Sequence, residues 1–111
     1  MRSKGAIGED KASKLLIKDG YTIIKRNFFT KFGEIDIIAN QKNRMHIIEV
    51  KLLKKKYIHL GYKINYTKQR RMIQSTYIFM DQYKLYNYYY QFDLITIIGD
   101  QIKHYKNIFT I

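Results

Sequence analysis

The sequence predicts one α/β domain whose elements follow the order helix, three strands, helix, and one or two strands. Apolar residues recur with helical spacing over residues 7–19 and again over residues 67–83. Between and after these helices, short apolar runs bounded by glycine, asparagine or polar clusters have the length of strands. A chain of 111 residues has the size of one domain, so residues 1–111 are expected to share a single sheet.

Local signals place the ends of the elements. Gly20 is a good stop for the first helix, and Thr67 is a plausible cap for the second. Residues 53–65 form a basic, irregular connection, and a loop of that length in a small domain is usually functional or mobile. Strands are expected over residues 21–27, 33–39, 45–52, 92–98 and 102–105.

The charge balance favours a phosphate-rich partner. Lysine and arginine number 21 against 9 acids, which gives a net charge of +12. A composition rich in isoleucine, lysine, tyrosine and asparagine can also raise the lysine count without a binding role. The chain has no cysteine, which excludes disulfides and thiolate zinc sites. Without a secretory signal or an apolar run of about 18 residues, we expect a soluble, cytoplasmic protein with no membrane partner.

Charged residues lie inside two otherwise apolar strands. Glu34 and Asp36 belong to the expected strand 33–39 and share one of its faces, and Glu49 and Lys51 belong to the strand 45–52, with a polar turn between the strands. Burying a charge is costly unless it is paired or binds a metal, so these residues form either a structural ion pair or a site. If the hairpin register places Asp36 opposite Glu49, three or four charged groups converge, because residues two apart share a face.

Two facing carboxylates repel each other unless a proton or a cation lies between them. Mg²⁺ typically takes one or two protein carboxylates and keeps its other positions for water and substrate phosphate. Lys51 would then lie near the attacking water and the phosphoryl oxygens. The predicted chemistry is hydrolysis of a phosphodiester by in-line attack.

Other charged residues have two interpretations each. Glu9, in the expected first turn of its helix, either complements the helix dipole or points towards the hairpin. Cations at the start of the second helix oppose its dipole, and bound phosphates would offset that cost. The candidate nucleic-acid-binding residues are Lys54, Lys55, Lys56, Lys68, Arg70 and Arg71. The alternative is that they are solvated surface charges with no binding role.

The histidines and one late acid are expected to be structural. His46, His59 and His104 lack the spacing of zinc ligands, so surface or packing roles are predicted for them. Asp93 is expected to be a core acid rather than a catalytic one.

Several blocks of the chain occur together in a known family. They are Gly5-Ala6-Ile7-Gly8-Glu9, Gly20-Tyr21-Thr22-Ile23, Arg26-Asn27, Gly33-Glu34-Ile35-Asp36-Ile37-Ile38-Ala39, Ile48-Glu49-Val50-Lys51, Lys68-Gln69-Arg70-Arg71, Phe92-Asp93 and Ile102-Lys103-His104-Tyr105-Lys106-Asn107-Ile108-Phe109. In this order they resemble the YraN-like uncharacterised bacterial proteins, within the PD-(D/E)xK (restriction-endonuclease-like) nuclease superfamily. The chain departs from the family pattern at Leu53, where an arginine is usual, and at Gln91, which precedes Phe92 in place of an arginine.

The resemblance implies a restriction-endonuclease-like αβββαβ core, with a central mixed sheet flanked by helices. It implies that Asp36, Glu49 and the carbonyl of Val50 bind the metal and that Lys51 is catalytic. Glu9 would approach this site from the first helix, as a further candidate ligand. Gln69 would approach from the second helix, near the metal or the substrate phosphate.

The expected function is therefore a nuclease that requires Mg²⁺, with Mn²⁺ as a substitute, and that hydrolyses DNA, including structured or branched DNA. Because junction-cutting relatives in the superfamily are dimers, a homodimer is also expected. The alternative is a nucleic-acid-binding protein that keeps the site with little or no turnover. A third interpretation is a basic structural protein whose acids are ion-paired.

Overall fold

The computed structural model describes residues 4–54 and 63–111. Within these residues the chain forms two helices and five strands in the order α, three β, α, two β. The elements are α1 (Lys4–Lys18), β1 (Thr22–Thr30), β2 (Gly33–Gln41), β3 (Arg44–Leu52), α2 (Tyr66–Tyr83), β4 (Tyr89–Ile98) and β5 (Gln101–Phe109).

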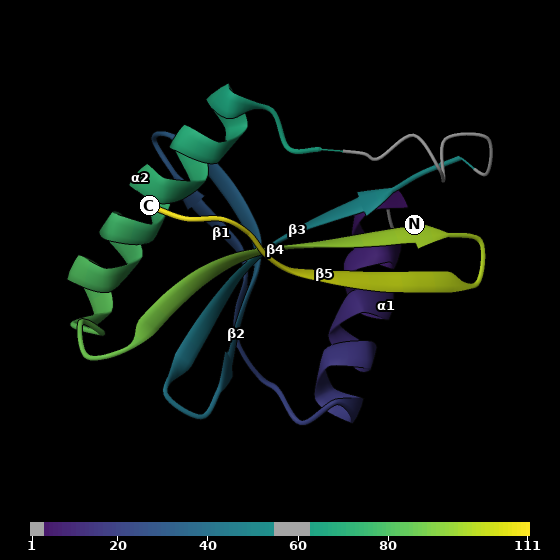
Figure 1. Cartoon of the computed structure of the whole chain (residues 1–111), viewed down its shortest axis with the longest axis horizontal. Coiled ribbons are helices and arrows are strands. Elements are labelled where there is room, and N and C mark those ends of the chain that lie inside the picture. The colour runs from purple at the N-terminus through teal and green to yellow at the C-terminus, as the bar shows by residue number, and fades with distance from the viewer. Residues whose placement is uncertain (1–3, 55–62) are drawn as a thin grey trace.

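The five strands form one mixed sheet in the order β1-β2-β3-β4-β5 (Figure 1). Neighbouring strands are antiparallel except for β3 and β4, which are parallel and are connected through α2. A parallel pair needs a crossover connection, and the segment containing α2 supplies it. The architecture predicted from the sequence is confirmed, and it is compatible with a restriction-endonuclease-like core.

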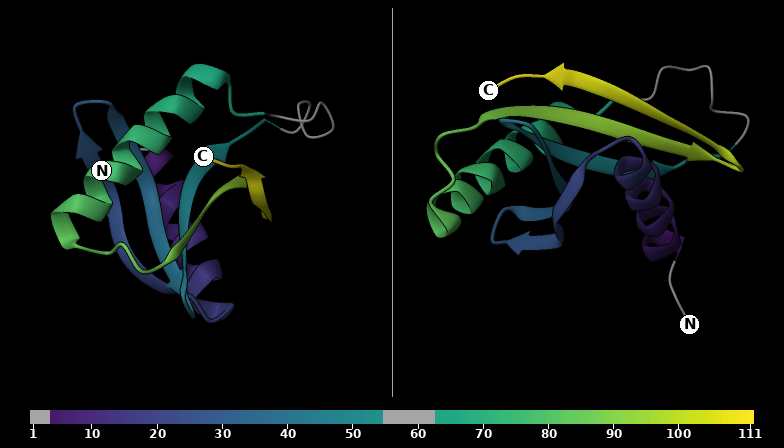
Figure 2. Two further views of the ribbon diagram at one scale, coloured as in Figure 1. Left: turned by 60° about the vertical axis from the view of Figure 1, so that its left-hand side comes forward. Right: turned by 90° about the horizontal axis from the view of Figure 1, so that it is seen from below.

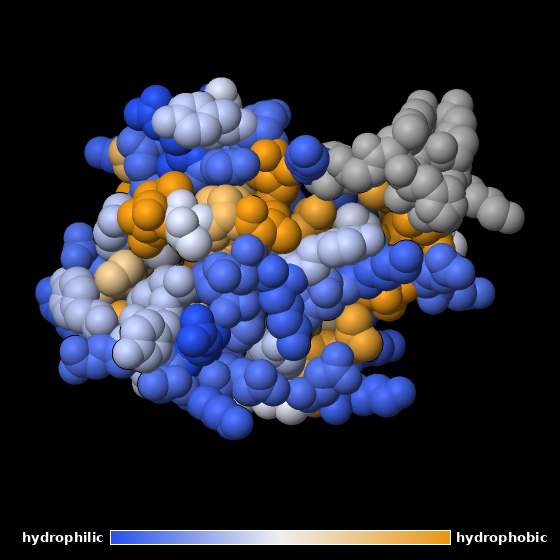
Figure 3. Space-filling view, viewed as in Figure 1, coloured by the Kyte–Doolittle hydropathy of each residue, from blue (hydrophilic) through white to orange (hydrophobic). Residues whose placement is uncertain are grey.

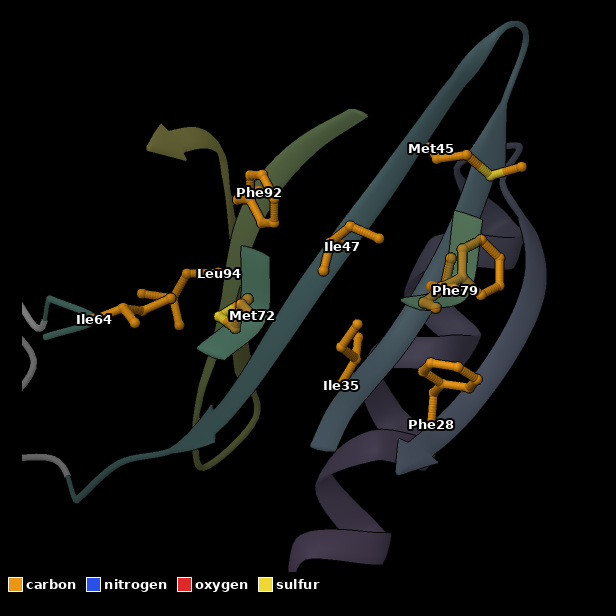
Figure 4. Packing of buried hydrophobic residues seen from close by; sticks show 10 residues of the cluster. Phe28, Ile35, Met45, Ile47, Ile64, Met72, Phe79, Phe92 and Leu94 are labelled. Atoms are coloured by element: carbon orange, nitrogen blue, oxygen red, sulfur yellow. The ribbon is translucent and has the colours of Figure 1, made fainter. Parts of the chain in front are cut away.

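The two helices cover opposite faces of the sheet, each over its own apolar cluster (Figure 2). Under α2, Phe79 of the helix meets Phe28 of β1 edge to face, with ring centroids 5.6 Å apart (Figure 4). Ile38 and Ile47, which are paired across the hairpin, belong to this cluster. On the other face, Leu16 of α1 packs in a cluster with strand residues that include Ile48.

The predicted ends of several elements are wrong. The first helix begins at Lys4, not at residue 7, so Glu9 lies beyond its first turn and does not cap the dipole. The cap of α2 is Asn65, not Thr67: the Asn65 side chain accepts a hydrogen bond from the Lys68 N–H at 2.9 Å. Strand β1 continues through the expected loop to Thr30, because residues 28–30 keep pairing with β2 as far as Gly33, although Asn27 adopts φ 54°. Strands β4 and β5 are also longer than expected.

In the described residues, neither helix combines the length and the apolar character that a membrane crossing requires. The face shown in Figure 3 is mainly hydrophilic, with a strip of hydrophobic side chains between α2 and the C-terminal strand.

Replacing the C-cap residue of α2, Lys84, by glycine should stabilise the fold. Lys84 is the C-cap in the left-handed conformation, with φ 56° and ψ 38°, where a side chain is strained. We expect Lys84→Gly to raise the free energy of unfolding by about 0.5–1 kcal/mol, measured by urea denaturation. The matched control is Lys14→Gly inside α1, which should lower it by about 1 kcal/mol. Equal destabilisation by both variants would contradict the argument.

Candidate active site

A polar cavity of about 270 Å³ lies where β2 and β3 meet the N-terminal parts of both helices. Its wall contains four carboxylates, two lysines, and small or apolar residues from α1 and β3. They are Gly5, Gly8, Glu9, Glu34, Asp36, Glu49, Val50, Lys51, Leu52 and Lys68.

The hairpin brings Asp36 and Glu49 together. The β2–β3 ladder runs from Gln41↔Arg44 to Ile37↔Ile48, and Asp36 and Glu49 are the next residues of the two strands. Beyond the ladder, the Val50 N–H donates to Asp36 Oδ2 at 2.8 Å. The Asp36 side chain therefore accepts the hydrogen bond of the Val50 N–H, and this bond orients the Asp36 carboxylate.

Three acids from two elements crowd one side of the cavity. Carboxylate oxygens of Glu9, Glu34 and Asp36 all lie within 4.8 Å of one another. Asn27 Nδ2 joins two of them, donating to Glu9 Oε1 at 2.7 Å and to Glu34 Oε2 at 3.4 Å. The pKa of Glu9 is raised by burial and by Asp36 and Glu34, against the bond from Asn27. The pKa of Glu34 is raised by burial and by Asp36.

Asp36 is the most perturbed acid of the cavity. Burial and the nearby Glu49 raise the pKa of Asp36 to about 7, against the hydrogen bond from Val50. On the other side of the pair, Lys68 Nζ of α2 lies 3.6 Å from Glu49 Oε1. The site thus stores like-charge repulsion that one lysine offsets in part.

An arginine fixes the helix that carries Glu9. Arg26 of β1 contacts Asp10 Oδ1 at 2.8 Å and lies 3.8 Å from Glu9 Oε1. Glu9 is buried, whereas Asp10 is partly exposed. These contacts attach the second turn of α1 to β1, so the carboxylate of Glu9 is held towards the hairpin.

Converging carboxylates suit a hard divalent cation. Oxygen donors are the ligands that Mg²⁺ prefers, and such a cation relieves the repulsion that raises these pKa values. The donor set of the cavity, which is carboxylates without histidine, therefore fits a magnesium-type ion.

A model of an uncharacterised protein family, UPF0102, matches residues 8–97. This chain belongs to UPF0102. A UPF0102 protein of Campylobacter jejuni subsp. jejuni serotype O:23/36 is 40% identical over 107 residues, which cover 94% of this chain and 91% of that protein. A UPF0102 protein of Persephonella marina is 38% identical over 109 residues, 96% of this chain and 92% of its own. One of Fusobacterium nucleatum is 35% identical over 101 residues, 90% and 85% respectively.

Most site residues predicted from the sequence lie together in this UPF0102 chain. Glu9, Asp36, Glu49, Val50 and Lys51 all line the acidic cavity. Their roles in metal binding and catalysis stay predictions.

The structure places Gln69 elsewhere. Its Nε2 donates to the Ile64 carbonyl at 2.9 Å, and the side chain lines a second cavity next to the acidic one. Lys68 points to the acids in its place. Among the other basic candidates, Lys54, Arg70 and Arg71 are exposed. Lys55, Lys56 and His59 lie outside the described residues.

Two members of the UPF0102 site were not among the site residues predicted from the sequence. The two-residue spacing placed Glu34 on the strand face of Asp36 without giving it a role, and its carboxylate lies with those of Glu9 and Asp36. Asn27 was expected only as the last residue of a strand. It has a φ of 54°, and its side-chain amide donates to Glu9 and Glu34. No feature of the local sequence indicates these contacts.

A second polar cluster lies in the sheet, away from the cavity. Asp93 is fully buried and accepts four hydrogen bonds, two on each oxygen. The donors are His46 Nδ1 at 2.6 Å, His104 Nε2 at 2.8 Å, Gln91 Nε2 at 2.8 Å and Asn107 N–H at 2.9 Å. Burial alone would raise the pKa of Asp93, but the four bonds bring it below its ordinary value. This UPF0102 chain therefore uses Asp93 as a core acid.

Binding of a divalent cation should depend on pH. Because the pKa of Asp36 is about 7, the cation must displace a proton at lower pH. We expect Mn²⁺ to raise the unfolding temperature strongly at pH 8, with affinity falling by up to about tenfold per pH unit below pH 7. In EDTA the sign reverses: a raised pKa stabilises the fold at low pH, and this contribution is lost as the pH rises through 7.

Differential scanning fluorimetry between about pH 5.5 and about pH 8.5, with Mn²⁺ or with EDTA, measures the stabilisation by the cation and the pH dependence of the metal-free fold. Asp36→Asn should remove them, whereas Asp100→Asn, in the exposed turn before β5, should not. A cation effect that is the same at all pH values would contradict the assignment to Asp36.

Proposed function

We propose that this chain is a metal-dependent nuclease that hydrolyses phosphodiester bonds in DNA. The observation that carries the proposal is one cavity lined by Glu9, Glu34, Asp36, Glu49 and Lys51, on a chain of net charge +12. Carboxylates by themselves repel DNA, because its phosphates are also negatively charged. A divalent cation between them converts that repulsion into attraction. The resemblance of Gly33–Ala39 and Ile48–Lys51 to the PD-(D/E)xK pattern supports the same assignment.

The acids would hold the cation. Asp36 and Glu49 are its main ligands in this proposal, with the Val50 carbonyl and Glu9 as further ligands. When bound, Mg²⁺ or Mn²⁺ would polarise the scissile phosphate and lower the pKa of water at the site. The Val50 N–H fixes the orientation of Asp36, and Asn27 holds Glu9 beside Glu34.

The lysines would act on charge and on the proton. Lys51 lines the cavity two residues after Glu49, so its ammonium can orient the attacking water and offset charge that develops on the phosphoryl oxygens. Lys68 compensates Glu49, which limits the cost of gathering so many acids. Arg70 and Arg71 are exposed in the first turns of α2, where they would bind the neighbouring phosphates.

Cleavage assays on labelled duplex, single-stranded and branched DNA, with Mn²⁺ and with EDTA, test the proposal. We expect cleavage that requires the cation and that stops in EDTA. DNA binding and cation binding without cleavage of any substrate would instead support a nucleic-acid-binding protein with a nuclease-like site. Absence of cation binding by calorimetry would overturn both.

A further inference from the structure

A second cavity, of about 470 Å³, is lined by residues next in the chain to those of the acidic cavity, at the end of β3 and the start of α2. Its volume lies within the range of ligand pockets, about 300–1,000 Å³. Most of its wall is apolar or aromatic, from the start of α2, β4 and β5, and includes Ile64, Leu94, Tyr105, Ile108 and Phe109. Figure 3 shows hydrophobic side chains between α2 and the C-terminal strand, over the elements that form this wall.

The sheet register connects the two cavities. Glu49 pairs with Leu94, and Leu94 pairs with Tyr105. Side chains of paired residues stand on the same face, so a line of three runs from the acidic site into the second cavity. Adjacent strands are about 4.8 Å apart, which puts Tyr105 about 10 Å from Glu49 across the sheet.

A second line runs parallel to the first. Lys51 pairs with Thr96, and Thr96 pairs with Lys103. Thr96 and Lys103 line the apolar cavity, as does Lys63 before α2. The lining of the apolar cavity therefore includes two exposed lysines.

The first turn of α2 separates the cavities. Lys68 lines the acidic cavity and Gln69, the next residue, lines the apolar one. Leu52 and Leu53 divide in the same way at the end of β3. A ligand that occupies both cavities needs an anionic part and an adjoining flat apolar part within a few ångströms.

We propose that the apolar cavity binds the base of an unpaired nucleotide next to the phosphate held at the acidic site. Aromatic rings such as those of Tyr105 and Phe109 offer a stacking surface, and Lys63 and Lys103 can bind the flanking phosphates. A base inside a duplex is already stacked and paired, so the strand bound here is single-stranded or locally unpaired. The inference rests on the proposed function, since it names the substrate class of that site.

Binding measured without cleavage tests the inference. Fluorescence anisotropy with Mn²⁺, in a Lys51→Ala background that keeps the cation and suppresses cleavage, would compare a labelled oligothymidine strand with the same strand carrying abasic residues and with a blunt duplex. The Lys51→Ala protein should bind oligothymidine at least about fivefold more tightly than the abasic strand, because one stacked base contributes about 1–3 kcal/mol. Tyr105→Ala should remove that difference.

Tyr77→Ala is the matched control. Tyr77 lies on α2 and is 45% exposed, close to the 44% of Tyr105, but it does not line the cavity. It should keep the preference for oligothymidine. Tyr105→Leu, which keeps an apolar side chain without a ring, should reproduce the loss if Tyr105→Ala fails to fold.

Equal affinity for the normal and abasic strands, a preference for the duplex, or loss of the preference in Tyr77→Ala but not in the Tyr105 variants would overturn the inference. Base-dependent binding without cleavage by the wild type in Mn²⁺ would keep it and overturn the nuclease. Cleavage by the wild type in Mn²⁺ with base-independent binding would do the reverse.

Discussion

Asp36→Asn is expected to lower cation-dependent cleavage of DNA by about a thousandfold or more, while the variant folds at least as stably as the wild type in EDTA. Removing the carboxylate removes a main ligand of the cation, and with it most of the stabilisation of charge in the transition state. The same change removes a carboxylate whose pKa is raised to about 7 by burial and by Glu49. Asparagine keeps an oxygen that can accept from the Val50 N–H.

The combination of lost activity and retained or increased stability is diagnostic. Substituting a residue that the fold needs lowers both activity and stability. Substituting a residue that belongs to a strained site lowers activity and raises stability. Single-turnover cleavage and urea denaturation of the same preparation measure the pair. If Asp36→Asn unfolded more easily than the wild type in EDTA, the acids would be structural ion-pair partners.

Lys51→Ala should distinguish cation binding from the cleavage step. The variant keeps all four carboxylates, so Mn²⁺ binding should persist while cleavage falls by about a hundredfold or more. Lys14→Ala, at an exposed position of α1, should change neither. Cleavage that survived in Lys51→Ala would point to a contaminating nuclease.

Much of the site could be read from the sequence because the hairpin is local. Strands β2 and β3 follow each other after a short turn, so the sequence predicted that Asp36 and Glu49 converge if the hairpin register places them opposite each other. Both residues line the acidic cavity. The paired core residues Ile38 and Ile47 follow from alternation within each strand. The expectation that residues two apart share a face fails at Ile35: it packs in the cluster under α2 with Ile38, whereas Ile37 packs in the cluster under α1.

The helix α2 shows why neighbouring side chains could not be distinguished. Successive residues in an α-helix point about 100° apart, so a small rotation of the helix decides whether residue 68 or 69 faces the hairpin. Asn65 rather than Thr67 caps the helix, which begins at Tyr66. With that start, Lys68 contacts Glu49, and Gln69 bonds to the Ile64 carbonyl. Packing of the whole helix sets this rotation, and no residue within the motif encodes it.

The cluster around Asp93 was even less accessible, because its members come from three strands. His46 lies on β3, Asp93 on β4 and His104 on β5. Their meeting depends on the parallel β3–β4 register across the α2 crossover, and on a register shift in β4–β5 between Phe92 and Leu94. The sequence predicted a core acid and packing histidines, which the structure confirms for Asp93 and His46, but it held no signal that they bond to each other.

Asp93→Ala is expected to lower the free energy of unfolding by about 3–5 kcal/mol, the usual cost of removing one partner from a buried charged network. Four donors converge on this carboxylate, and each would be left without its acceptor. Urea denaturation measures the loss. Asp100→Ala, in the exposed turn between β4 and β5, is the matched control and should change stability by about 0.5 kcal/mol or less.

The same carboxylate should make the fold acid-sensitive, with the opposite sign to Asp36. The pKa of Asp93 is lowered in the folded chain, so its contribution is complete above the ordinary aspartate pKa of about 3.9 and is lost as the pH falls below that value. Because a carboxylate only accepts hydrogen bonds, His46 Nδ1 and His104 Nε2 are both donors while Asp93 is ionised. The wild type should therefore lose stability below about pH 4 more steeply than Asp93→Asn, in which no proton is taken up at this position. Parallel acid unfolding curves for the two proteins would show that the network does not depend on the charge of Asp93.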